Sequence, residues 1–392
     1  MSSDFSERFH ATYRLRANAR DVQARAQALA LEQSIEMPLE AVTQAAVRDR
    51  VVARVESIEP VASPASADGF EVKLSLATRT TGLEAGQLLN MLFGNCSLQP
   101  DVELVEFEPS AELLQAMPGP RFGVDGWRRA VGLDRGQPRA LTCTALKPQG
   151  LPPQGLAELA RTFALAGIDV IKDDHGIADQ ADAPFAQRVA AVQRAIVQAA
   201  GERGSSTRSL YAPTLSGGPR RLREQLRIAR EEGVGAVLVC PMLCGVPTLV
   251  ELVREEAGVP ILAHPAFAGN ARVAPALLLG RMFRMFGADA TIFPNFGGRF
   301  SYDRATCRAI AQRAREPLGN FAPSLPVPAG GMRTERVGEM IEEFGTDVML
   351  LIGGHLLAGA ATAGDSVLAR ATAFVRQVHA APPPSRAAGR AV

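Results

Sequence analysis

The chain has 392 residues, of which 47% are hydrophobic and 21% are charged. This length predicts a barrel-sized domain of about 250 residues with a smaller partner domain, and the apolar content predicts a globular fold. With 42 basic and 41 acidic side chains the formal net charge is +1, so bulk electrostatics gives no case for nucleic acid or an anionic membrane as a partner. Any bound anion must be held by a local site.

The cysteines and the N-terminal segment bear on location. Five cysteines are scattered along the chain, unlike a disulfide framework or paired zinc ligands, and a reducing cytoplasm fits them best. The first residues include Asp4, Glu7 and Arg8 in place of the apolar core of a signal peptide. No apolar run approaches the roughly 20 residues that span a bilayer. We expect a cytoplasmic protein.

Residues 1–135 predict a small α+β domain with an antiparallel sheet. Strand-like patterns cover 9–15, 48–58 and 70–77, and an alanine-rich helix is expected over 21–31. The stretch 59–69, with prolines and small polar residues, predicts a loop.

Residues 136–378 repeat an apolar run, a turn and a helical stretch. The expected strands are 139–147, 168–173, 209–214, 236–241, 260–265, 288–294, 321–327 and 347–352. The expected helices include 156–166, 185–200, 220–232, 274–286, 304–315 and 333–344. Such alternation predicts parallel strands, and the repeat number favours a closed (β/α)8 TIM barrel over a doubly wound open sheet. Residues 379–392, with consecutive prolines, predict a flexible tail.

Ionisable residues follow the second barrel strand as Lys172-Asp173-Asp174-His175. Burying such a group costs too much desolvation for mere packing, although a solvated charged loop is the alternative. Because the carboxyl ends of barrel strands converge on one mouth, these residues should meet others that end strands. The others are Lys147, His264, Asn295, Gly330, Gly331, Gly353 and Gly354.

This cluster predicts a metal centre. Asp174, with Asp173 or His175, could bind a divalent cation; carboxylates favour Mg²⁺ or Mn²⁺, whereas imidazole favours a transition metal. Lys147 could move a proton on a carbon acid. His264 could contact substrate or could be a satisfied core histidine.

The two glycine pairs predict a phosphate site. Gly330-Gly331 and Gly353-Gly354 end the last two strands, where barrels often hold phosphate on backbone N–H groups. A simple turn is the alternative for each pair alone.

Several motifs together resemble the ribulose-bisphosphate carboxylase superfamily, and specifically its RuBisCO-like proteins (form IV). They comprise 141–151, with Lys147-Pro148, and 167–175, which resembles a metal motif. They also comprise 325–331 and 350–354 at the phosphate, and 32–34 and 89–95 in the first domain.

The resemblance implies cofactors and partners. It implies Mg²⁺ or another divalent metal held partly by a carbamylated Lys172, and a phosphorylated small-molecule substrate. It further implies that Glu32 and Asn90 reach a neighbouring subunit's barrel, so that a homodimer or higher homo-oligomer is expected. Asn295 and Arg299 complete the expected set of substrate- and phosphate-binding residues.

Departures from the carboxylase pattern argue against fixation of carbon dioxide. They are His175 for glutamate, Gln149 for lysine, Pro265 for arginine, Ala329 for serine and a different segment over 294–300. We therefore expect a metal-dependent carbon–carbon lyase that forms an enediolate. Similarity to family patterns favours decarboxylation of a 3-oxo sugar acid phosphate of the 3-oxo-isoapionate 4-phosphate type, with Lys147, His264 and Lys172 as catalytic residues. The alternatives are an enolase or isomerase of methionine-salvage type, or a non-catalytic sugar-phosphate binder.

Overall fold

The structure, a computed structural model, describes residues 7–61, 69–133, 139–255, 258–358 and 366–382. The chain divides into two compact units. The first comprises Met1–Pro118 with Phe267–Leu278, and the second comprises Gly119–Ala266 with Leu279–Val392. The sequence placed the boundary near residue 135, whereas the second unit already begins at Gly119.

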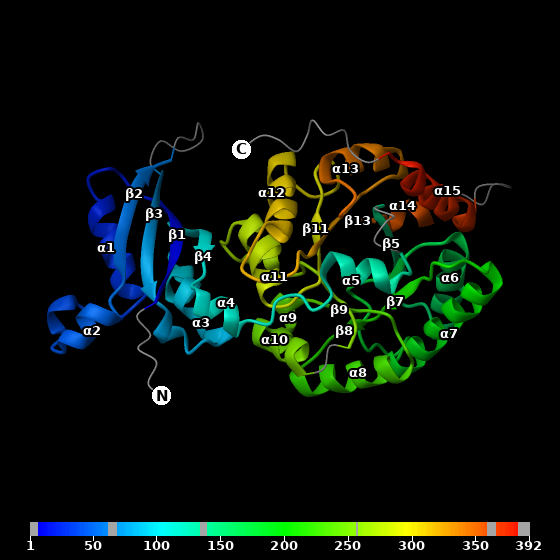
Figure 1. Ribbon diagram of the computed structural model, residues 1–392, viewed down its shortest axis with the longest axis horizontal. Helices are drawn as coiled ribbons and strands as arrows, with labels where there is room; N and C mark the ends of the chain where they lie inside the picture. Colours follow the sequence, from blue (N-terminus) through cyan, green and yellow to red (C-terminus); the bar gives the residue numbers. More distant parts are fainter. Residues whose placement is uncertain (1–6, 62–68, 134–138, 256–257, 359–365, 383–392) are drawn as a thin grey trace. The chain divides into compact units, whose positions relative to one another are not determined.

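The first unit contains a four-stranded antiparallel sheet in the order β2-β3-β1-β4 (Figure 1). Its strands are β1 (Arg8–Arg16), β2 (Arg54–Pro60), β3 (Gly69–Ala77) and β4 (Val102–Glu108). Side chains of β1 alternate between buried and half-buried, as the two-residue period of a strand requires. The helices of this unit are α1 (Val22–Glu32), α2 (Ala45–Arg50), α3 (Ala85–Phe93) and α4 (Ala111–Ala116).

One strand prediction in this unit is partly wrong. The sequence predicted a strand over 48–58, but residues 45–50 are helical and the strand starts only at Arg54. Arg48 and Arg50 lie in the last turn of α2, where positive charge stabilises a helix terminus. Residues 62–68 of the predicted loop lie outside the described residues.

The second unit is a barrel of parallel strands, and the predicted fold class is confirmed. The strands are β5 (Leu141–Leu146), β6 (Val170–Asp173), β7 (Leu210–Ala212), β8 (Thr214–Leu215), β9 (Val237–Val239), β10 (Ile261–Ala263), β11 (Ala290–Pro294), β12 (Leu325–Ala329) and β13 (Met349–Leu351). They pair in the orders β13-β5-β6-β7 and β8-β9-β10-β11-β12. Pro213, which has no N–H to donate, interrupts the third strand between β7 and β8, so the chain changes partner there. The other seam joins β12 to β13.

Helices surround this barrel (Figure 1). They are α6 (Pro153–Ala166), α7 (Phe185–Arg203), α8 (Pro219–Glu231), α9 (Pro241–Cys244), α10 (Val246–Glu255), α11 (Phe283–Met285), α12 (Arg304–Arg315), α13 (Val337–Phe344), α14 (Gly354–Leu357) and α15 (Val367–Ala380). A π-helix, Ala276–Met282, replaces most of the α-helix expected over 274–286. The end of α15 extends into the predicted tail, whose residues 383–392 are not described.

Helix α5 (Gly123–Ala130) packs its apolar face into the barrel core. Val124 and Trp127 are buried with residues that begin the barrel strands, including Leu141, Val170 and Leu210. This contact covers the amino ends of the strands, so the carboxyl ends are the ones left for a site.

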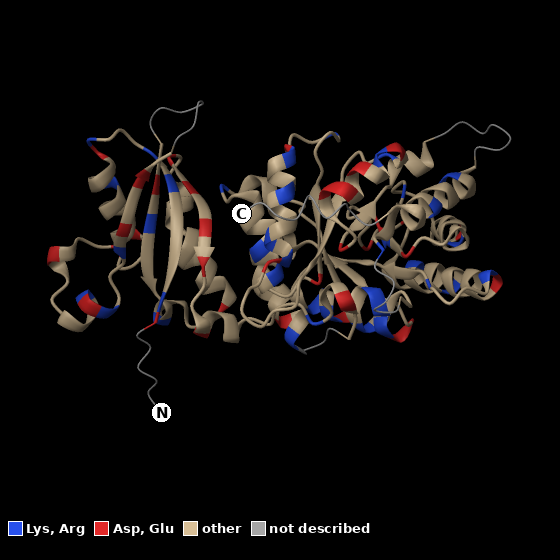
Figure 2. Ribbon diagram, turned by 45° about the horizontal axis from the view of Figure 1, so that its top comes forward, with Lys and Arg blue, Asp and Glu red and all other residues tan. Residues whose placement is uncertain are grey.

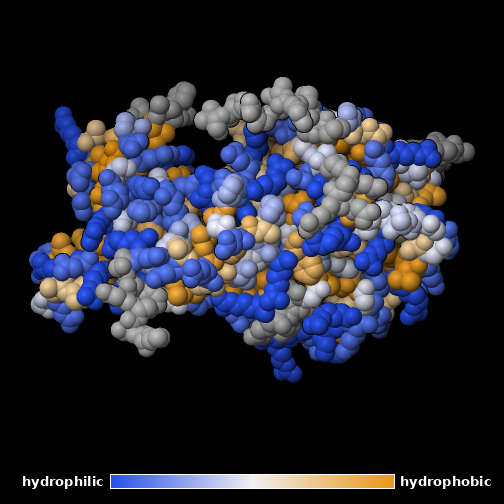
Figure 3. All heavy atoms as spheres, in the orientation of Figure 1, coloured by the Kyte–Doolittle hydropathy of each residue, from blue (hydrophilic) through white to orange (hydrophobic). Residues whose placement is uncertain are grey.

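The surface agrees with the near-neutral composition. Acidic and basic residues are interspersed on both units (Figure 2), and hydrophilic and hydrophobic residues are interspersed over the face in Figure 3. Within the described part of the chain, no helix has the length and apolar character needed to cross a membrane.

Candidate active site

Lys147 and Asp174 form an ion pair at the mouth of the barrel. Lys147 follows β5 and Asp174 follows β6, and these strands are parallel neighbours. The Lys147 Nζ donates to Asp174 Oδ2, while the backbone N–H of Gly176 donates to Oδ1 at 3.2 Å. Burial raises the pKa of Asp174, but the hydrogen bond from Lys147 and the charges of Lys172 and Lys147 outweigh it, so the pKa is lowered. Asp174 is therefore a carboxylate at neutral pH.

Lys172 lies deeper, inside the end of β6. It is 3% exposed, and its Nζ donates to the backbone oxygen of Asp173 at 2.8 Å. Burial lowers the pKa of Lys172, and the nearby Asp174 carboxylate only partly opposes that shift. A larger share of neutral amine follows, and the neutral amine is the form that can react as a nucleophile.

His175 and His264 stack across the mouth. Their ring centroids are 4.0 Å apart and the planes differ by 13°. Burial lowers the pKa of His264 to about 2, with a further contribution from the charge of Lys172. The backbone N–H of Ala266 donates to His264 Nδ1 at 3.1 Å, so the hydrogen of the neutral ring must lie on Nε2. His264 is thus a neutral hydrogen-bond donor.

Asp173 does not face the mouth, and its assignment as a possible metal ligand is corrected here. It is fully buried, and its oxygens accept hydrogen bonds from Tyr211 Oη, Arg188 Nε and the backbone N–H of Thr214. Alternate residues of a strand point to opposite sides, so Asp173 points away from the side that Lys172 and Asp174 share. The two-residue period of a strand is a signal in the sequence for this orientation of Asp173, whereas no sequence pattern predicted its partners Tyr211 and Arg188.

The two glycine pairs differ in how closely other residues pack against them. Gly330 and Gly331 have φ values of 86° and 101°, and the loop after β11 packs on them closely. A Cβ on Gly331 would lie 2.9 Å from the backbone nitrogen of Arg299, so loop packing already requires glycine there. Gly354 has open space where a Cβ would be, and a Cβ on Gly353 would meet only ordinary contacts with Ala145 and Lys147. The second pair therefore leaves the backbone more accessible to an anion.

Two predicted substrate-binding residues, Asn295 and Arg299, lie in the loop after β11 and have different surroundings. Asn295 is buried, its Nδ2 contacts the sulfurs of Met332 and Met340, and its Oδ1 has no hydrogen-bond partner among the described residues, so its predicted contact with substrate stays a prediction. Arg299 is exposed, its backbone N–H donates to the Gly330 oxygen at 3.0 Å, and its guanidinium lies 5.1 Å from the centroid of the Phe300 ring. Burial lowers the pKa of His175, and the charges of Lys172, Lys147 and, least, Arg299 add to that shift. Arg299 stays a candidate for phosphate.

Glu32 and Asn90 lie in the first unit. Glu32 ends α1 and accepts a hydrogen bond from Asn95 Nδ2 at 3.0 Å, while Asn90 lies in α3 beside Gln87. Their predicted contact with a neighbouring subunit's barrel stays a prediction.

The donor set at the mouth can be tested for a metal. Among the described residues, no group of three or more His, Cys, Asp or Glu side chains is arranged to hold a metal ion. Asp174 and His175, whose Oδ1 and Nδ1 are 3.5 Å apart, offer two adjacent ligands. Lys172 would add an anionic oxygen only as a carbamate. The residues present therefore fit a hard divalent cation once Lys172 carries carbon dioxide.

Comparisons with known proteins place this geometry in a family. The family model for the ribulose bisphosphate carboxylase large chain, catalytic domain, matches residues 127–381. The 5-methylthioribulose-1-phosphate isomerase of Rhodospirillum rubrum is 49% identical over 373 residues, 95% of this chain and 96% of that one. The 2,3-diketo-5-methylthiopentyl-1-phosphate enolase of Geobacillus thermodenitrificans is 34% identical over 295 residues, 73% of this chain and 70% of that one.

A solved structure agrees with these relatives. The crystal structure of the Rubisco-like protein from Rhodopseudomonas palustris has a TM-score of 0.85 at 48% identity, covering 95% of this chain and 97% of that one. Identity at this level extends through both units. The chain therefore belongs to the ribulose bisphosphate carboxylase large-chain family, as one of its RuBisCO-like proteins.

Proposed function

We propose that the protein is a metal-dependent isomerase of a phosphorylated, sugar-like ketone of the 5-methylthioribulose 1-phosphate type. The carrying observation is the Lys147–Asp174 pair beside two stacked imidazoles at the barrel mouth. The relatives named above are an isomerase and an enolase, so they support the methionine-salvage alternative better than the decarboxylase that the sequence patterns favoured.

Isomerisation needs a proton to leave a carbon next to the carbonyl and a proton to reach the former carbonyl carbon. The first step leaves an enediolate, and the second forms a new carbonyl, so no atom is gained or lost. Lys147 is placed to move this proton because its side chain is a third exposed at the mouth and is paired with Asp174 there.

The negative charge on the substrate oxygens must be stabilised while the proton moves. His264 supports this role with its Nε2–H, since burial keeps the ring neutral and Ala266 fixes the tautomer. A divalent metal held by Asp174, His175 and carbamylated Lys172 would polarise the substrate carbonyl when bound.

The phosphate would bind beside Lys147, at the second glycine pair. A Cβ on Gly353 would lie 3.9 Å from Lys147 Cε, so the second glycine pair adjoins the stem of the lysine. Arg299 supplies a guanidinium from the loop after β11. We also propose that Glu32 and Asn90 complete the site of a second copy in a homodimer.

The experiment incubates the protein with Mg²⁺, bicarbonate and 5-methylthioribulose 1-phosphate in D₂O and follows the substrate by NMR. We expect an isomeric product and deuterium at the carbon that gains the proton. Asp174→Ala should abolish both, because it removes a metal ligand and the partner of Lys147. A parallel assay offers a phosphorylated 3-oxo acid. Release of carbon dioxide there, without isomerisation or exchange, would overturn the proposal in favour of the decarboxylase.

A further inference from the structure

Behind the ligand-bearing end of β6 lies a fully buried polar cluster of Asp173, Arg188 and Tyr211. Tyr211 Oη donates to Asp173 Oδ1 at 2.8 Å, and Arg188 Nε donates to Oδ2 at 3.1 Å. Both charged side chains are 0% exposed. Burying an ion pair costs desolvation that its attraction often fails to repay, so stability alone is a weak reason to place one here.

The cluster is tied to the residues that face the mouth through the backbone. Asp173 stands between Lys172 and Asp174, and its backbone oxygen accepts the hydrogen bond from Lys172 Nζ. Thr214 links the two sides, because its N–H donates to Asp173 Oδ2 at 3.0 Å and its Oγ1 donates to the Asp174 backbone oxygen at 3.3 Å. Fixing the Asp173 side chain therefore fixes the strand end from which both neighbours project.

Arg188 extends this constraint to the loop that carries His175. Its Nη1 donates to the backbone oxygens of Ala178 at 2.8 Å and Ala183 at 2.6 Å. Both carbonyls belong to the segment between β6 and α7. One guanidinium thus holds the end of β6 and the loop that follows His175.

We propose that Asp173, Arg188 and Tyr211 are positioning residues that set the geometry of Lys172, Asp174 and His175 for binding a divalent cation. The inference rests on the proposed function, since it presumes the metal site. Groups that orient metal ligands in this way typically change metal affinity by ten- to a hundredfold when they are removed.

The test compares two single-hydroxyl deletions from one strand region. Tyr211→Phe removes the bond to Asp173 and keeps the ring. Ser209→Ala is the matched control, because Ser209 Oγ donates to the Ile168 oxygen at 2.6 Å at the opposite end of β6. Isothermal titration calorimetry with Mg²⁺ in bicarbonate buffer gives the affinity, and thermal unfolding gives the stability of each variant.

We expect roughly tenfold weaker Mg²⁺ binding by Tyr211→Phe and unchanged binding by Ser209→Ala, at similar small losses of melting temperature. Equal affinities for both variants would overturn the inference. Tighter binding by Tyr211→Phe would also overturn it, because a freed Asp173 would then be a ligand. Wild-type protein that binds no Mg²⁺ would overturn the proposed function and this inference together.

Should Tyr211→Phe not fold, Arg188→Lys replaces it. That change keeps a positive charge beside Asp173 but cannot make all three guanidinium hydrogen bonds, to Asp173, Ala178 and Ala183. Weaker Mg²⁺ binding than in Ser209→Ala supports the inference, and equal binding overturns it.

Discussion

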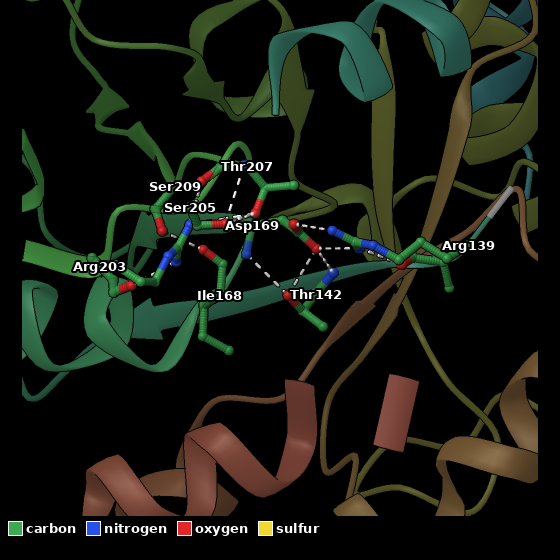
Figure 4. Close-up of polar contacts among 10 residues, drawn as sticks. Arg139, Thr142, Ile168, Asp169, Arg203, Ser205, Thr207 and Ser209 are labelled. Atoms are coloured by element: carbon green, nitrogen blue, oxygen red, sulfur yellow. Dashed lines mark hydrogen bonds and ion pairs between the residues drawn. The ribbon is translucent and has the colours of Figure 1, made fainter. Parts of the chain in front are cut away.

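Two carboxylates at opposite ends of β6 differ in the partners that hold them. Asp169 precedes the strand, is 2% exposed and binds Arg139 through both oxygens (Figure 4). It also accepts from the N–H and Oγ1 of Thr142, and its own N–H donates back to Thr142. Asp174 follows the strand, and its main partner is a lysine that is a third exposed at the mouth.

The difference lies in what each carboxylate could still bind. Protein donors already occupy both oxygens of Asp169, so a ligand would have to break a buried network. Both oxygens of Asp174, which is 6% exposed, also accept from protein donors, but the donor to Oδ2 is the side chain of Lys147, a third exposed. A cation or substrate could therefore replace that lysine without leaving a fully buried cation unpaired. In barrels the amino ends of strands serve stability and the carboxyl ends serve catalysis, and the role that we propose for Asp174 would follow that division.

The largest expected effect is a loss of stability on removing Asp169 at the amino end of β6. Asp169→Ala leaves the guanidinium of Arg139, 15% exposed, without its carboxylate, and removing one partner of a buried pair costs about 3–5 kcal/mol. Urea unfolding should show that loss as a lower midpoint at an unchanged slope. The folded variant should keep wild-type affinity for Mg²⁺, and a selective loss of that affinity would contradict the division between the two ends.

The next largest expected effect is a loss of turnover on changing Lys147 at the mouth of the barrel. Lys147→Met should lower turnover by roughly a hundredfold, within the range of a lost proton donor or acceptor. The same change removes the ammonium that competes for Asp174 Oδ2, so Mg²⁺ affinity should stay the same or rise. Steady-state kinetics and calorimetry on the same preparation measure both. If turnover and metal affinity fell together, Lys147 would belong to the binding site and another group would move the proton.

The sequence predicted the second unit well because continuous apolar strands and alternating helices leave few alternatives to a barrel. The ends of strands were accurate enough to bring Lys147, Asp174, His175 and His264 to one mouth. Their partners were harder to predict. The Lys147–Asp174 pair and the imidazole stack depend on side-chain positions that strand periodicity does not fix.

The errors arose where tertiary packing overrides a local pattern. Residues 48–50 have strand-like neighbours, yet they complete a short helix. For Asp173, strand alternation would have separated a packed carboxylate from its two mouth-facing neighbours.

The smallest expected effect sharpens the comparison between the glycine pairs. Gly354→Ala adds a methyl group in open space and requires no left-handed backbone, so the fold should be unaffected. If the substrate phosphate binds at this pair, the Michaelis constant of the Gly354→Ala variant for the phosphorylated substrate should rise about tenfold. That rise is equivalent to about 1.4 kcal/mol of lost binding. Gly331→Ala is the matched control, because its φ of 101° and the nearby Arg299 nitrogen predict a loss of stability instead. Steady-state kinetics and thermal unfolding of both variants separate the two effects. An unchanged Michaelis constant for Gly354→Ala would place the phosphate away from this pair, with Arg299 as the remaining candidate.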